Sequence, residues 1–191
     1  MNIIVTGASR GIGWELVQLF AQNTENKIFA LSRNKNRLNE LADLCKNNMQ
    51  NSQVLPISID INDLQSIAPT INGQIPSNEH IDIVIHNAGY LVAKPFSELS
   101  ITEVENMYRV NVTGPFELTR ALLPNLKLAK QPHVVNISSM GGFQGSVKFP
   151  GLTAYASSKA AIAGLTECLA EELKETRIKV NCMQLSLVNT L

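Results

Sequence analysis

Short apolar runs alternate along the chain with longer segments of helical spacing. β-Branched and apolar runs predict six buried strands, over residues 2–6, 27–31, 54–59, 81–85, 133–137 and 177–185. Apolar residues at helical spacing predict helices over 14–20, 34–48, 62–71, 101–130 and 153–174. Strand and helix in alternation predict one α/β domain over residues 1–191, a doubly wound parallel sheet with helices on both faces.

Two local signals refine the predicted helices. Asn34 stands where a side-chain cap would begin the second helix. Gly114 and Pro115 fall inside the long fourth helix and are expected to kink it, because proline removes a backbone donor and crowds the preceding turn.

Charge and hydropathy exclude several classes of function. The chain of 191 residues has 16 acidic and 16 basic side chains, which gives no electrostatic case for nucleic acid or an anionic membrane surface as a partner. The hydrophobic share of 45% and the charged share of 17% are typical of a globular domain. No apolar run approaches the ~18 residues of a membrane span. We expect a soluble, cytoplasmic protein.

Cysteine and histidine give no metal site. The three cysteines are odd in number and far apart, which favours reduced thiols over a disulfide framework or a zinc site. We expect His86 and His133 to be structural and His80 to be a solvated loop residue.

A glycine-rich turn follows the first strand and precedes the first helix. Residues 6–13 read T-G-A-S-R-G-I-G, with the spacing G-x-x-x-G-x-G. Glycines in such a turn let the backbone approach a phosphate, and the helix N-terminus offers unpaired N–H groups to the anion. A purely structural glycine turn is the alternative.

The next strand end favours one form of dinucleotide. Arg33 follows the second strand, where an acidic residue would bind the ribose of NAD. A cation there suits the 2′-phosphate of NADP, and Arg10 in the glycine turn is a second candidate. NADP is therefore preferred to NAD.

Further polar and small residues stand at other strand and helix ends. Asn87, Ala88 and Gly89 follow the fourth strand and suit a cofactor passing over the edge of the sheet. Asn111 precedes the break at Gly114 and has two readings, as a site residue or as a packed polar residue in a bent helix.

Tyr155 and Lys159 are the residues at which we place the chemistry, although a tyrosine and a lysine at this spacing also occur on ordinary amphipathic helices. Four residues apart on a helix, they share one face. A phenol has a pKa near ~10, and a neighbouring ammonium favours its ionised form, so the pair can work as a general acid or base. Ser138 and Ser139 end the fifth strand and can meet this face in space.

Together these motifs resemble the short-chain dehydrogenase/reductase family. The matches keep the order of that family and its approximate spacing over nearly the whole chain. They are the glycine turn at 6–13, Asp60, Asn87-Ala88-Gly89, Asn111, Ser138-Ser139 and Tyr155-x-x-x-Lys159. The resemblance implies a Rossmann-type fold and an NADP-dependent oxidoreductase that moves a hydride between nicotinamide and a carbonyl or alcohol substrate.

The resemblance also implies the catalytic roles. Tyr155 would be the general acid/base, and Lys159 would lower its pKa and hold the nicotinamide ribose. Ser139, the second of the pair, would hydrogen-bond the carbonyl oxygen, and Asn111 would hold a water in a proton relay to Lys159. A positioned donor and a hydroxyl stabilise the negative charge that develops on this oxygen.

The remaining implied cofactor contacts lie along the ends of the strands. Asp60 would bond the adenine amino group, with Ile61 beside it, and Ser32 with Arg33 matches members that prefer NADP. The full set of expected cofactor residues is Gly7, Ser9, Arg10, Gly11, Ile12, Gly13, Ser32, Arg33, Asp60, Ile61, Asn87, Ala88, Gly89, Tyr155, Lys159, Val188 and Thr190. A homodimer or homotetramer is also implied, through the helix after Asn111 and the helix that carries Tyr155.

The sequence departs from the family pattern in two places. Leu185 and Ser186 replace the usual Pro-Gly before Val188 and Thr190. Family members usually continue through a substrate-covering helical loop and a last strand, so we expect these elements to be missing from the present chain, which ends at Leu191. Both departures leave open an alternative function, a catalytically weak or inactive NAD(P)-binding regulator or scaffold of the same fold.

Overall fold

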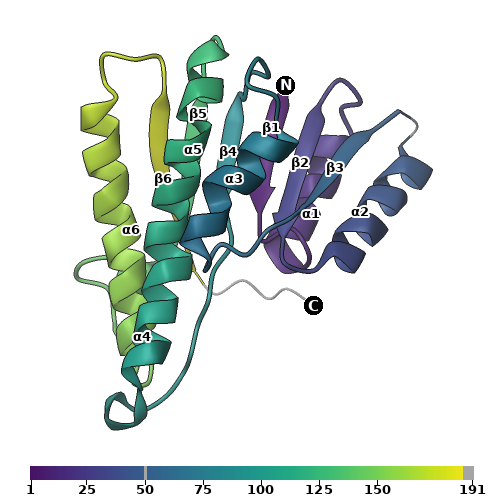
Figure 1. Ribbon diagram of the computed structural model, residues 1–191. Coiled ribbons are helices and arrows are strands. Elements are labelled where there is room, and N and C mark those ends of the chain that lie inside the picture. Colours follow the sequence, from purple (N-terminus) through teal and green to yellow (C-terminus); the bar gives the residue numbers. More distant parts are fainter. Residues whose placement is uncertain (50, 187–191) are drawn as a thin grey trace.

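The computed structural model describes residues 1–49 and 51–186, which form a six-stranded parallel sheet with helices on both faces (Figure 1). The strands are β1 (Asn2–Thr6), β2 (Lys27–Ser32), β3 (Gln53–Ser58), β4 (Ile83–His86), β5 (His133–Ser139) and β6 (Lys179–Leu185). Their order across the sheet is β3-β2-β1-β4-β5-β6, and every neighbouring pair is parallel. The predicted doubly wound α/β fold is confirmed.

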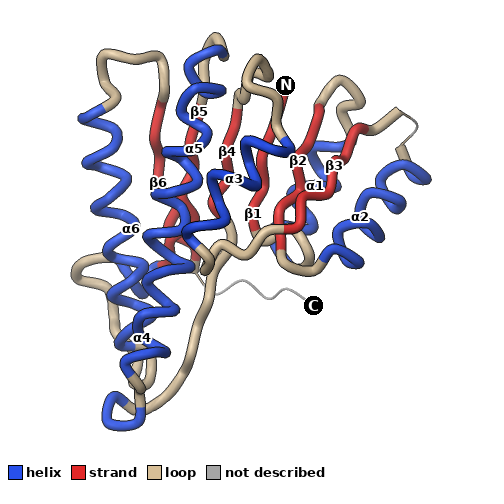
Figure 2. Tube along the Cα trace, viewed as in Figure 1, coloured by secondary structure: helices blue, strands red, loops and turns tan. Residues whose placement is uncertain are grey.

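The helices follow the strands in the predicted alternation (Figure 2). They are α1 (Gly11–Ala21), α2 (Lys35–Asn48), α3 (Leu64–Gln74), α4 (Ile101–Tyr108), α5 (Gly114–Leu128) and α6 (Thr153–Glu172). There are also three short helical turns, η1 (Phe96–Glu98), η2 (Arg109–Thr113) and η3 (Met140–Gly142). The Asn34 side chain accepts from the Arg37 N–H at 3.1 Å and caps α2, as predicted.

The alternating side chains of the strands build two cores. Ile4 of β1 faces one side with Val84 and Val134, where it packs under α3 and α5. Ile3 and Val5 face the opposite side, where α1 and α2 cover them. In Figure 1, α3 and α5 lie in front of the strands and α1 lies behind them. β1, β2 and β4 are buried along nearly their whole length, and their sequences are almost continuous apolar runs, whereas β3, β5 and β6 include partly or fully exposed positions.

The long fourth helix predicted over 101–130 differs from the structure. It is divided into α4, the five-residue π-helical turn η2, and α5, which carries Pro115 in its first turn. Proline is tolerated there because the first-turn N–H groups have no partner within the helix. The irregular turn therefore precedes Gly114, and it is a π-helical turn, which contains one residue more than an α-helical turn.

Other boundaries shift by a few residues. The strand predicted over 81–85 runs from Ile83 to His86, and the helix predicted over 62–71 runs from Leu64 to Gln74 with Pro69 inside it. Among the described residues no helix is long and apolar enough to cross a membrane. The three cysteines are free thiols.

Candidate active site

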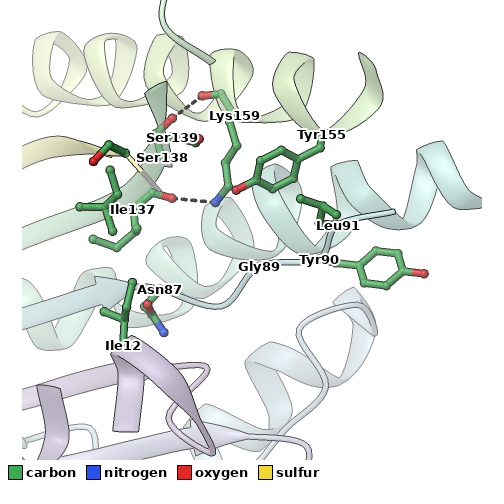
Figure 3. A pocket seen from close by; sticks show the side chains of 12 residues that line it. Ile12, Asn87, Gly89, Tyr90, Leu91, Ile137, Ser138, Ser139, Tyr155 and Lys159 are labelled. Atoms are coloured by element: carbon green, nitrogen blue, oxygen red, sulfur yellow. Dashed lines mark hydrogen bonds between the residues drawn. The ribbon is translucent and has the colours of Figure 1, made fainter. Parts of the chain in front are cut away.

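The site lies between β1 and β4, where the order of the strands along the sheet reverses. The chain leaves β1 toward β2 on one side and leaves β4 toward β5 on the other, so their carboxyl ends border a crevice. A pocket of about 280 Å³ opens there (Figure 3). It is lined by Ile12, Asn87, Gly89, Tyr90, Leu91, Ile137, Ser138, Ser139, Tyr155, Lys159, Leu185 and Ser186.

The glycine turn closes the crevice beside β1. Gly7 has a φ of +69°, a conformation that favours glycine. A Cβ on Gly13 would lie 2.5 Å from the Gly7 carbonyl oxygen, so only hydrogen fits there. No side chain caps α1 at Arg10. The N–H groups of the first turn of α1 are thus available to an anion, and the turn fits a dinucleotide phosphate.

Asn87 and Thr6 lock the two sides of the crevice together. The Asn87 amide donates to the Thr6 carbonyl oxygen at 3.0 Å, and the Ala88 N–H donates to the Thr6 hydroxyl at 2.9 Å. These bonds hold the end of β4 against the end of β1. The segment at Ala88 and Gly89 is therefore fixed relative to the glycine turn at Gly7, as a cradle for one ligand requires.

Tyr155 and Ser139 share the pocket on the other side of the crevice. Tyr155 lies in the first turn of α6, and Ser139 ends β5. Burial raises the pKa of the Tyr155 phenol, and hydrogen bonding by the Ser139 hydroxyl offsets part of this rise by favouring the ionised form. The phenol is therefore neutral at pH 7 and able to donate its proton.

The two serines at the end of β5 have different surroundings. The Ser138 hydroxyl is buried and donates to the Lys159 carbonyl oxygen at 2.7 Å, which ties β5 to α6. The Ser139 hydroxyl accepts from the Gly141 N–H at 3.2 Å and keeps its own proton for another acceptor. This difference supports the choice of Ser139 as the residue that meets the substrate.

Lys159 is a buried cation at the base of the pocket. It is 4% exposed, and its amino group donates to the Ile137 carbonyl oxygen at 2.8 Å. Burial lowers the pKa of the ammonium to about 8, with a smaller opposing effect from Cys182. Its amino group lies 5.8 Å from the centre of the Tyr155 ring. Figure 3 shows the amino group and the phenol reaching into the same pocket.

Asn111 sits inside the π-helical turn and is 2% exposed. Its amide oxygen accepts from the Tyr90 N–H at 2.8 Å, and its amide nitrogen donates to the Tyr90 carbonyl oxygen and to the Ser158 hydroxyl, both at 2.9 Å. The side chain therefore joins the segment after β4 to α6. A Cβ on Gly89 would lie 3.7 Å from both the Asn111 oxygen and the Lys159 amino group, so these groups border the same point.

The expected adenosine contacts lie farther out along the strand ends. Ser32 ends β2 and Arg33 follows it; the Ser32 hydroxyl accepts from the Asn34 N–H at 3.2 Å, and the Arg33 side chain is exposed. Asp60 accepts from the Asn62 N–H at 3.0 Å. Ile61 is 7% exposed and packs so closely on Gly114 that a Cβ there would lie 2.2 Å away. The Ile61 side chain is thus part of the hydrophobic core.

The other residues of the expected cofactor set fall into two groups. Ser9, Gly11 and Ile12 belong to the turn and the first residues of α1, and Ile12 lines the pocket. Val188 and Thr190 lie outside the described residues. Within the described part of the chain, no group of three His, Cys, Asp or Glu side chains lies together as a metal site.

Several residues at the site carry no recognisable signal in the sequence. Leu91 lines the pocket from a loop. Leu185, the last residue of β6, and Ser186 also line it, and the sequence marked these two only as a replacement of the usual Pro-Gly. Cys182 lies near Lys159 from β6. His86 is buried behind the site, bonds the Thr119 hydroxyl at 2.8 Å, and has its pKa lowered by burial to about 3, which agrees with a structural role.

The chain is similar to known proteins over nearly its whole length. A family model described as short chain dehydrogenase matches residues 1–191. The chain is 32% identical over 192 residues to the rat protein Dehydrogenase/reductase SDR family member 7B, with 98% of this chain and 58% of that protein covered. It therefore spans little more than half the length of that relative.

Two further comparisons agree. The chain is 32% identical over 190 residues to an NADP-dependent 3-hydroxy acid dehydrogenase of Schizosaccharomyces pombe, covering 99% of this chain and 72% of that protein. The crystal structure of a dehydrogenase/reductase from Sinorhizobium meliloti 1021 matches with a TM-score of 0.88 at 25% identity, covering 99% of this chain and 73% of that one.

Proposed function

The chain belongs to the short-chain dehydrogenase family, and we propose that it is an NADP-dependent oxidoreductase acting on a carbonyl/alcohol pair. The observation that carries the proposal is the shared pocket of Ser139, Tyr155 and Lys159, which opens onto the glycine turn across one crevice. Cofactor binding is thereby assigned to the glycine turn and proton transfer to Ser139 and Tyr155, on two sides of the same site.

Residues of this chain fit the cofactor at each part of the crevice. The first-turn N–H groups of α1 and the backbone around Gly7 and Gly13 would hold the pyrophosphate. Asp60 would bind the adenine, and Lys159 the nicotinamide ribose. When bound, the cofactor would supply or accept the hydride, and the protein would provide orientation and protons.

The choice of NADP rests on two exposed arginines. Arg33 follows β2 and Arg10 lies in the glycine turn, so both border the expected position of the adenosine ribose. Guanidinium groups bind phosphate through parallel N–H donors. The related enzyme of Schizosaccharomyces pombe is named as NADP-dependent, which supports the same preference.

Tyr155 is proposed to deliver the proton during carbonyl reduction. Its neutral phenol and the Ser139 hydroxyl would both donate to the carbonyl oxygen, where negative charge develops. The loss of the phenolic proton is unfavourable in a buried site, and the Lys159 ammonium nearby stabilises the phenolate that results. In alcohol oxidation the same groups would act in reverse.

Asn111 is proposed to support a proton relay to Lys159. Its amide oxygen already accepts from Tyr90, but an amide oxygen has two lone pairs and can accept a second donor. A water bonded there would lie beside Gly89, toward the Lys159 amino group. Such a water would connect the lysine with the solvent.

A homodimer or homotetramer is part of the proposal. Phe116 of α5 is 43% exposed and Ile101 of α4 is 73% exposed, while the small residues Ala160 and Gly164 are exposed on α6. Apolar and small side chains on these helices suit close packing against a second copy. Light scattering at micromolar concentration would measure the mass of the assembly.

The proposed function is tested by cofactor binding followed by turnover. The purified protein should bind NADPH more tightly than NADH, and should oxidise NADPH in the presence of at least one member of a panel of aldehydes and ketones. Absence of binding at millimolar cofactor would overturn the proposal. Binding without turnover of any panel member would assign the chain to nucleotide binding alone.

A further inference from the structure

We propose that the substrate is an uncharged carbonyl compound with a large apolar substituent, such as an aryl or long alkyl group, held by Leu91 and by apolar side chains of the loop at 140–152. This inference rests on the proposed function, since it concerns the substrate of the same site. The proposal is based on Leu91, which lines the pocket with Ser139 and Tyr155, and on the exposed apolar side chains of the loop that begins beside Ser139.

Leu91 presents an apolar side chain at the pocket. It lines the pocket with Tyr155 and Ser139, and it is 47% exposed. Figure 3 shows Leu91 on the same side of the pocket as the Tyr155 phenol, whereas the Tyr90 ring points away. The backbone of Tyr90 is held on both sides by Asn111, so the neighbouring Leu91 is kept in place.

The loop at 140–152 follows Ser139 and carries exposed apolar side chains. A Cβ on Gly141 would lie 3.6 Å from the Ser139 hydroxyl, so the loop begins beside the site. Its large apolar residues are exposed to solvent: Met140 41%, Phe143 49%, Val147 75% and Phe149 60%. The loop also meets the segment after Leu91, because the Lys94 N–H donates to the Gly151 carbonyl oxygen at 3.1 Å.

The lysines of the loop at 140–152 and of the segment after Leu91 are bonded within the protein. The Lys148 amino group bonds the carbonyl oxygens of Gly141 and Phe143 at 2.7 Å and the Ser146 hydroxyl at 2.9 Å, which accounts for its three donors. These bonds fold the loop back toward Gly141. Lys94 pairs with Glu103.

The lysine at the base of the pocket is also hydrogen-bonded within the protein. Lys159 is 4% exposed and bonds the Ile137 carbonyl oxygen. The described residues at the mouth therefore offer apolar contact area rather than a cation for a carboxylate or phosphate. An apolar substituent that covers Leu91 and the loop gains free energy from the area removed from water, whereas a charged one loses hydration without a partner.

The test compares ligand binding, independently of turnover. Dissociation constants of phenyl-substituted ketones and of 2-oxo acids with equal numbers of carbon atoms are measured by calorimetry on the full chain, with and without NADP⁺. We expect the ketones to bind at least about tenfold more tightly than the oxo acids, given the cost of leaving a charge unpaired. Equal affinity, or tighter binding of the oxo acids, would overturn the inference.

Matched variants locate the binding surface. Leu91→Asn should weaken ketone binding about fivefold and leave NADPH binding unchanged, since a half-exposed leucine contributes part of its transfer free energy. Leu19→Asn, at a 58% exposed leucine on α1, is the control and should change neither. Phe149→Ser should also weaken ketone binding. If instead it alters only the mass of the assembly, the loop is an interface and the inference is wrong.

Failure of the proposed function gives a different result. In that case NADP⁺ and NADPH do not bind, or no carbonyl compound is reduced, whatever the preference between ketones and oxo acids. Ketone binding that is weakened by Leu91→Asn would still support an apolar pocket. If the protein binds NADPH but shows no such ketone binding, this inference alone is refuted.

Discussion

The amino group of Lys159 lies 5.8 Å from the centre of the Tyr155 ring, on the same face of α6. Its position is fixed by a hydrogen bond to the Ile137 carbonyl oxygen of β5 at 2.8 Å. The helix supplies the spacing of the pair, and the strand supplies the anchor. A buried ammonium is thereby kept close to a half-buried phenol, which is the arrangement that a tyrosine acid/base requires.

The burial of Lys159 has a consequence for stability. Burial lowers the pKa of its ammonium to about 8, whereas a lysine in an unfolded chain titrates near ~10.4. Between these values the unfolded chain holds a proton that the folded protein has released, so the lysine makes the free energy of unfolding rise with pH in this window. Below about pH 8 the cost of burying the charge is fully present.

Lys159→Met removes the titrating group and nearly conserves its volume. Relative to the wild type, this variant should be most stable below pH 8, and its advantage should shrink between pH 8 and pH 10. Urea unfolding of both proteins at several pH values measures the difference. A difference that does not change with pH would show that the ammonium is not destabilised by burial.

The nature and order of the strands and helices could be predicted because each apolar run is local in the sequence. The π-helical turn at Arg109–Thr113 could not, because a proline in a helical pattern predicts a break and not its form. The contacts of Asn111 with Tyr90 and Ser158 join segments far apart in the chain. Leu91, an ordinary loop leucine in the sequence, becomes a pocket residue only through this folding.

The glycine turn gives a second prediction. A Cβ on Gly13 would lie 2.5 Å from the Gly7 carbonyl oxygen and 2.6 Å from the Asn87 amide nitrogen, so Gly13→Ala must displace the turn. We expect about 1–3 kcal/mol of destabilisation from this overpacking, together with weaker NADPH binding. Denaturant unfolding and fluorescence titration measure the two effects.

Gly73→Ala is the matched control for this change. Gly73 lies in α3 with no neighbouring atom within 4 Å of an added Cβ. The substitution should stabilise the helix by roughly 0.5–1 kcal/mol and leave NADPH binding as it is. If both alanine variants bind NADPH like the wild type, the turn at Gly13 is not part of the cofactor site.

Arg33 is expected to decide between the two nicotinamide cofactors. Arg33→Asp replaces a phosphate-binding cation with an acid that repels the 2′-phosphate and can accept from ribose hydroxyls. The ratio of NADPH to NADH affinity should fall roughly tenfold or more, since hydrogen bonds to charged groups contribute ~1.5–3 kcal/mol. Arg177→Asp, at an exposed residue before the start of β6, makes the same charge change at the opposite edge of the sheet. Equal ratios in the two variants would exclude Arg33 as the phosphate-binding residue.

The most direct test of the account is the rate of NADPH oxidation with a ketone substrate by wild type and by Tyr155→Phe. The substitution removes the phenolic proton and keeps the ring, so we predict a loss of about 10²–10⁴-fold in kcat with NADPH affinity nearly unchanged. Tyr108→Phe, in α4, should retain wild-type activity. Turnover by Tyr155→Phe at the wild-type rate would contradict the account, because Tyr155 would then not be the proton donor.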